Sequence, residues 1–134
     1  CHNGNNDICD SARGDAEWNG LSPFGKEVVR KMNETGVLVD ISHAAESTFY
    51  DALETSTYPI IASHSSARAL CNHPRNLTDE QLKALAEQGG VAQISLQRIH
   101  QRRCRKSVPE RCDPSYRPYR RPDRDQPCRD RFRL

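Results

Sequence analysis

The chain has 134 residues, a length typical of one domain, and no apolar run near the ~20 residues of a membrane-spanning helix. Its net charge of +2 conceals a division. Residues 1–96 carry 7 Lys and Arg against 13 Asp and Glu, whereas residues 97–134 carry 13 against 5. This asymmetry indicates two different kinds of sequence joined near residue 96. The six cysteines include no CxxC pair, which argues against a zinc-finger or zinc-ribbon site.

The first third of the chain predicts a long loop followed by a helix. Residues 1–20 are rich in Asn, Asp and Gly, a composition typical of loops. Ser22 and Pro23 form a helix start, with serine as the N-cap, and Gly36 is the expected end. Three apolar residues spaced four apart would form the buried stripe: Phe24, Val28 and Met32. The opening Cys-His-Asn-Gly, without a leader, suggests that the natural N-terminus lies upstream.

The sequence then alternates between apolar runs and helical patterns. Strands are predicted at 37–42, 59–63 and 91–96, and helices at 44–54, at 66–71 and from the capping box at 78–81 to Gly89. This order predicts an α/β fold with a parallel sheet. An eight-stranded barrel needs about 250 residues, so these three βα units would be only part of one.

Two of the predicted strands end on the same dipeptide, Ser42-His43 and Ser63-His64. Parallel strands keep functional residues at their carboxyl ends, where two imidazoles could share a zinc ion. Ser42, Ser63 and Ser65 could orient the rings. The alternative is that each histidine caps a helix or closes a turn. A serine nucleophile is a rival, but no GxSxG elbow is present and adjacency in sequence is not expected to place the hydroxyl against the ring nitrogen.

Arg75 follows Pro74 just before the capping box, and its guanidinium could bind a carboxylate through two hydrogen bonds. A surface arginine in a loop is the simpler interpretation. On local pattern alone, His2, His73 and His100 show nothing that indicates a function.

Together, residues 40–43, the motif Ser63-His64-Ser65-Ser66-Ala67 and Arg75 eleven residues after His64 resemble the membrane (renal) dipeptidases. The resemblance covers residues 1–96 almost continuously. It implies a TIM-type (β/α)8 barrel and a zinc-dependent dipeptidase, in which a metal-bound hydroxide attacks the dipeptide. It also implies that His43 and His64 bind one zinc of a two-zinc centre. His2 would contact the substrate, and Arg75 would hold its terminal carboxylate.

The chain departs from that family in three ways. An aspartate expected on the last strand, beyond residue 96, has no counterpart in the arginine-rich tail. No histidine is followed by x-Asp, the pair that holds the second zinc, and the bridging carboxylate is also missing. We therefore expect a central fragment that is inactive alone, whose partners would be the missing barrel segments and a dipeptide. A homodimer is one assembly that the parent could form. The compartment stays open between a bacterial cell envelope and the cytoplasm.

Residues 97–134 contain no Gly, Ala or Thr, and arginine supplies 12 of their 13 basic charges. This composition predicts a disordered tail or an out-of-frame reading. If the tail is genuine, the alternative function is a non-catalytic protein that binds nucleic acid or an acidic surface. A third hypothesis is a one-metal relative that hydrolyses another amide or ester.

Overall fold

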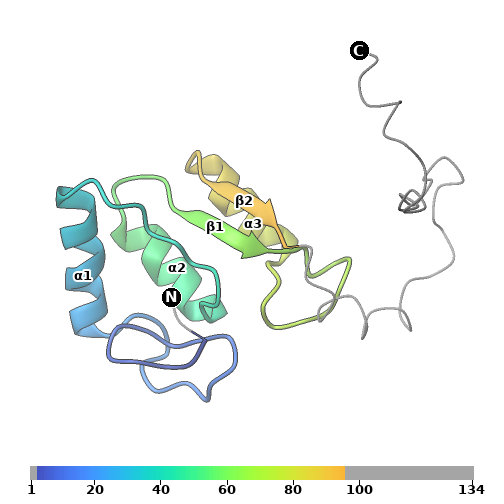
Figure 1. Cartoon of the computed structure of the whole chain (residues 1–134), viewed down its shortest axis with the longest axis horizontal. Coiled ribbons are helices and arrows are strands. Elements are labelled where there is room, and N and C mark those ends of the chain that lie inside the picture. The colour runs from blue at the N-terminus through green and yellow to red at the C-terminus, as the bar shows by residue number, and fades with distance from the viewer. Residues whose placement is uncertain (1–2, 96–134) are drawn as a thin grey trace, which may run out of the picture.

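The structure, a computed structural model, describes residues 3–95 (Figure 1). Its elements are, in order, α1 (Pro23–Glu34), α2 (Glu46–Thr55), β1 (Ile61–Ser65), α3 (Asp79–Glu87) and β2 (Val91–Ile94). His2, the tail at 97–134 and the last residue of the predicted strand 91–96 lie outside the described residues. No helix among residues 3–95 is long and apolar enough to cross a membrane.

β1 and β2 form a parallel pair and lie side by side (Figure 1), as the alternation of strands and helices predicts. Ile61 pairs with Val91 and Ala62 with Ala92. The described residues thus form a mixed helix and strand structure with an open two-stranded sheet. β1 begins and ends two residues later than predicted, so His64 lies within the strand and not after it.

The predicted strand at 37–42 is wrong as a regular strand, although its middle part pairs as expected. Asp40 forms an isolated parallel bridge with Ile61 on β1. The Ile41 N–H donates to the Ile61 carbonyl at 2.8 Å, and the Ile61 N–H donates to the Val39 carbonyl at 2.9 Å. Val37 and Leu38 are more than half exposed, so the start of the run does not extend the pairing. Three parallel segments nevertheless lie next to one another in the order 39–41, β1, β2.

The first helix begins and ends as predicted, but it buries a different face. The Ser22 hydroxyl accepts the Gly25 N–H at 2.9 Å, and Gly36 has φ +72°. Gly25 and Val29 are buried, whereas Phe24 is 56% exposed, so the predicted stripe is wrong at Phe24. The N-terminal loop packs against the helix face that carries Gly25, and this face is therefore the buried one. The contact is so close that a Cβ on Gly25 would collide with the Ile8 carbonyl.

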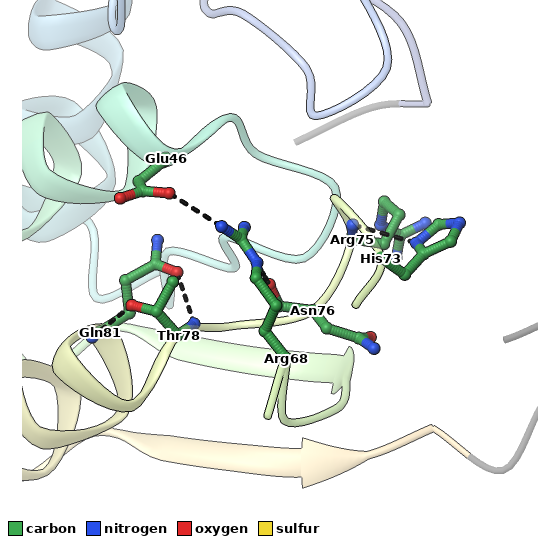
Figure 2. A network of polar contacts seen from close by, with 7 residues as sticks. All are labelled: Glu46, Arg68, His73, Arg75, Asn76, Thr78 and Gln81. Atoms are coloured by element: carbon green, nitrogen blue, oxygen red, sulfur yellow. Dashed lines mark hydrogen bonds and ion pairs between the residues drawn. The ribbon is translucent and has the colours of Figure 1, made fainter. Parts of the chain in front are cut away.

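The capping box of α3 is confirmed, because the Gln81 N–H donates to Thr78 Oγ1 at 3.1 Å and the Thr78 N–H donates to Gln81 Oε1 at 2.9 Å (Figure 2). The helix predicted at 66–71 is wrong. Its backbone groups bond instead to Leu77, which donates to the Ser66 carbonyl at 2.9 Å and accepts from the Arg68 N–H at 2.7 Å. These bonds close residues 66–77 into a compact loop.

The core joins both halves of the described chain. Its buried apolar side chains come from the N-terminal loop, the helices and the strands: Cys9, Leu21, Val29, Val39, Ile41, Phe49, Ala52, Ile60, Ala62, Leu77 and Leu85. The loop at 3–20 is ordered around the buried Asp10, whose carboxylate accepts N–H groups of Glu17, Trp18 and Gly20. Burial alone would raise the pKa of Asp10, but these hydrogen bonds outweigh it and lower that pKa.

Candidate active site

Parallel pairing brings the two predicted histidines together. Because Asp40 is level with Ile61, the residues three positions further on, His43 and His64, also lie level with each other. Their ring centres are 4.9 Å apart and the ring planes are inclined at 61°. His64 belongs to β1, whereas His43 stands in a turn with φ +78°, a conformation that few residues other than glycine adopt.

The loop at 66–77 places Arg75 next to His43 and His64. Arg68 holds the loop: its Nη1 donates to Glu46 at 3.1 Å and its Nε to the Asn76 carbonyl at 3.0 Å (Figure 2). Within the loop, the Arg75 N–H donates to His73 Nδ1 at 3.1 Å. Arg68, Glu46 and His73 carried no functional prediction.

Arg75 is a buried arginine, only 8% exposed, and the surface-loop interpretation is therefore wrong. Its Nη1 donates to His43 Nδ1 at 2.7 Å, and its Nη2 lies 3.4 Å from the His64 carbonyl. Its Nε is buried and has no hydrogen-bond partner. A buried guanidinium donor without a partner is costly, and an incoming acceptor such as a carboxylate would satisfy it.

On its other side, His64 contacts Ser63 and, through it, Asp40. Ser63 Oγ lies 2.7 Å from His64 Nδ1, so the expectation that adjacency keeps these atoms apart is wrong. The same hydroxyl donates to Asp40 Oδ2. Asp40 is a candidate functional residue that sequence reasoning left without a role. The signal was a carboxylate placed two residues before the first Ser-His pair.

This arrangement does not match a serine nucleophile. In a catalytic triad the histidine takes the proton of the serine and the carboxylate holds the other ring nitrogen. Here the carboxylate of Asp40 holds the serine hydroxyl itself, so the proton of Ser63 is directed away from His64. Of the other serines expected to orient the rings, Ser42 accepts the backbone N–H of His64 at 3.0 Å. Ser65 accepts the Ser95 N–H through its carbonyl.

The electrostatics of the site keep its groups in the forms that bind a cation. Burial, the Arg75 charge and the neighbouring His64 together lower the pKa of His43 to about 4, so its ring is neutral at neutral pH. Burial alone would raise the pKa of Asp40, but hydrogen bonds from Ser63 and Ser42 outweigh it and lower that pKa. Neutral imidazoles are the form of histidine that ligates metals.

The two rings fit a shared zinc ion in type and spacing. Imidazoles that bind one tetrahedral zinc at roughly 2.0–2.1 Å have ring centres about 5 Å apart. The observed 4.9 Å agrees with this arrangement. Among residues 3–95, however, no group of three or more His, Cys, Asp or Glu side chains is placed to hold a metal. The described residues therefore contain no complete metal centre.

The chain is similar in sequence to known dipeptidases. The sequence matches the family described as membrane dipeptidase (peptidase family M19) over residues 1–113. Dipeptidase tcpJ of Claviceps purpurea is 46% identical over 95 residues, which are 70% of this chain and 22% of that protein. Dipeptidase 3 of Mus musculus is 40% identical over 77 residues, which are 58% of this chain and 16% of that protein.

Solved structures give the same picture. The probable dipeptidase PvdM from Pseudomonas aeruginosa matches with a TM-score of 0.68 and 37% identity, over 70% of this chain and 25% of that one. A metallo peptidase from Rhodobacter sphaeroides, solved with a phosphinate mimic of the dipeptide L-Ala-D-Ala, matches with a TM-score of 0.57 and 33% identity, over 63% and 23%. The chain thus spans a quarter or less of the length of these relatives.

Proposed function

Because this chain belongs to the membrane dipeptidase family, peptidase family M19, we propose that it is part of a zinc-dependent dipeptidase. The observation that carries the proposal is the convergence of His43, His64 and Arg75. Two imidazoles provide metal ligands, and a buried guanidinium provides recognition of a carboxylate, beside each other in one site. A metal ligand pair next to a carboxylate receptor suits a substrate whose scissile bond is one residue from its C-terminus.

In this proposal each residue has one role. His43 and His64 hold one zinc ion, and Arg75 binds the terminal carboxylate of the dipeptide. His2, which lies outside the described residues, contacts the substrate near its scissile carbonyl. Zinc, when bound, would supply Lewis-acid polarisation of that carbonyl and activation of the attacking water. Arg75 would fix the distance between the carboxylate and the metal ligands, so longer peptides would place the wrong bond at the centre.

The fold proposal follows the same lines. Residues 1–96 would form about three βα units of a (β/α)8 barrel, with 97–134 as a separate Arg- and Pro-rich tail. The parallel order 39–41, β1, β2 supports this assignment, since neighbouring barrel strands follow one another along the chain. Val91 and Ile94 on β2 are more than half exposed, as expected where a further barrel segment would pack.

We expect little or no dipeptide turnover by the 134-residue chain alone. No histidine in the sequence is followed by x-Asp, and no group of three or more His, Cys, Asp or Glu side chains in residues 3–95 is placed to hold a metal. Turnover of a simple dipeptide by the purified chain, abolished by a chelator, would contradict this expectation.

Calorimetric zinc titration tests the metal assignment. The parent chain should bind zinc weakly, and His43→Ala or His64→Ala should abolish binding. Arg75→Ala is the matched control and should bind zinc at least as tightly, because the variant removes a nearby cation and the donor that occupies His43 Nδ1. If the double histidine variant binds zinc as well as the parent does, the assignment is wrong.

Carboxylate recognition needs a separate measurement. The probe is a phosphinate dipeptide mimic, of the kind bound by the Rhodobacter sphaeroides enzyme, compared with the same compound amidated at its C-terminus. The zinc-loaded chain should bind the free acid more tightly, and Arg75→Ala should remove the difference. Equal binding of acid and amide by the parent would exclude Arg75 as the carboxylate receptor.

A further inference from the structure

A continuous chain of hydrogen bonds runs from Asp40 through Ser63 to His64. Asp40 Oδ1 accepts the backbone N–H of Ser42 at 2.9 Å and that of Ser63 at 3.1 Å. Asp40 Oδ2 accepts the Ser63 hydroxyl, whose oxygen lies 2.7 Å from His64 Nδ1. This series of hydrogen bonds links the 39–41 segment to β1, so it depends on the parallel pairing of these two segments.

The positions of the protons follow from what each group can donate. An ionised carboxylate only accepts hydrogen bonds, and Asp40 is the acceptor in its bonds from the Ser42 N–H, the Ser63 N–H and the Ser63 hydroxyl. The single hydroxyl proton of Ser63 is therefore used on Asp40, and toward His64 the Ser63 oxygen can only accept. His64 Nδ1 must then carry a proton, which leaves the lone pair of the neutral ring on Nε2.

The neighbouring ring holds its proton on the opposite nitrogen. An arginine has no acceptor, so the 2.7 Å contact makes His43 Nδ1 the acceptor from Arg75. The neutral His43 ring then carries its proton on Nε2, so zinc binding at His43 in the proposed function requires Arg75 to release Nδ1. The two imidazoles, 4.9 Å apart, are thus set in different tautomers by different partners. This contrast provides an internal reference for any measurement on His64.

We propose that Asp40, acting through Ser63, is a positioning residue that fixes His64 as the Nδ1–H tautomer and so presents Nε2 as its metal-binding nitrogen. The tautomer part stands on hydrogen-bond geometry alone. The metal part rests on the proposed function, in which His64 is a zinc ligand. Residues that orient a ligating histidine in this way typically change metal affinity by about 10–100-fold when replaced.

The decisive variant is Asp40→Asn, which keeps the shape of the side chain and reverses the hydrogen-bond direction. The amide oxygen can still accept the two backbone N–H groups, while its NH2 now donates to Ser63 Oγ. The Ser63 proton then turns to His64 Nδ1, and the ring must move its own proton to Nε2. We expect His64 to change from the Nδ1–H to the Nε2–H tautomer, and zinc affinity to fall about 10–100-fold.

The tautomer is read by long-range ¹H–¹⁵N NMR correlations of the full chain labelled with ¹⁵N-histidine, without metal, at about pH 7.5, above the ordinary histidine pKa. His64→Gln assigns the signals of His64. Ser63→Ala removes the hydroxyl and leaves the backbone bonds of Asp40 in place, so it should also release the Nδ1–H tautomer. Ser63→Thr should restore it. The matched control is Ser66→Ala, because the Ser66 hydroxyl donates to the Ser95 carbonyl and not to His64. This variant should leave the His64 tautomer unchanged.

The outcomes separate the two parts of the proposal. An unchanged Nδ1–H signal in both Asp40→Asn and Ser63→Ala overturns the positioning role, whatever happens to zinc binding. A changed tautomer with unchanged zinc affinity keeps the positioning role and removes His64 from the metal site, which contradicts the proposed function. If Asp40→Asn fails to fold, Ser63→Ala and its Ser63→Thr rescue decide the tautomer alone.

Discussion

Acidification should destabilise the chain through His43 in particular. The pKa of this ring is about 4 in the folded protein, against an ordinary value of 6.5. Between these values the unfolded chain binds a proton at His43 that the folded chain does not, so stability falls as pH decreases. The stability that is linked to the neutral His43 ring is fully present above about pH 6.5 and is lost as the pH falls to about 4.

The size of the effect follows from the shift. A lowering from 6.5 to about 4 corresponds to at most about 3.4 kcal/mol, at 1.36 kcal/mol for each pKa unit. Because His43 is only partly buried, solvent screening reduces this figure, and we expect about 1–2 kcal/mol. Other groups also titrate over this range, so the effect has to be measured as a difference between two chains.

The comparison is with His43→Asn, because asparagine does not titrate and tolerates the positive φ of this position. The free energy of unfolding of both chains would be measured by urea denaturation at about pH 7.5 and about pH 4.5. The parent should lose about 1–2 kcal/mol more than the variant over this interval. Equal losses, or a larger loss in the variant, would refute the reasoning.

Two further predictions concern stability. Gly25→Ala should lower the free energy of unfolding by about 2 kcal/mol or more, because the added Cβ meets the backbone oxygen of Ile8, which cannot move aside easily. Gly4→Ala, where nothing lies within 4 Å of the new carbon, is its control in the same urea titration and should change little. Thr78→Ala should cost about 1 kcal/mol by removing the N-cap of α3, and Thr78→Ser should restore most of the loss. A Thr78→Ala chain with the thermal midpoint of the parent would show that the cap contributes nothing.

Sequence alone was enough for the features that depend on local chemistry. Ser22 and Thr78 begin their helices as predicted, because an N-cap satisfies backbone N–H groups only two or three residues away. The repeated Ser-His pair predicted that His43 and His64 would meet, because equivalent positions on parallel neighbours lie level. The motifs around His43, His64 and Arg75 together resemble the membrane dipeptidases, and the match over residues 1–113 confirms that family.

Only the tertiary structure decided the features that depend on contacts between distant residues. The buried face of α1 is set by Ile8, and the loop at 66–77 takes its shape from bonds to Leu77 that replace a helix. The direction of the hydrogen bond at each imidazole comes from Asp40 and Arg75, 24 and 32 residues away from the histidines they influence. Local pattern could place the two rings, but the partners that determine which nitrogen carries each proton are brought to them only by folding.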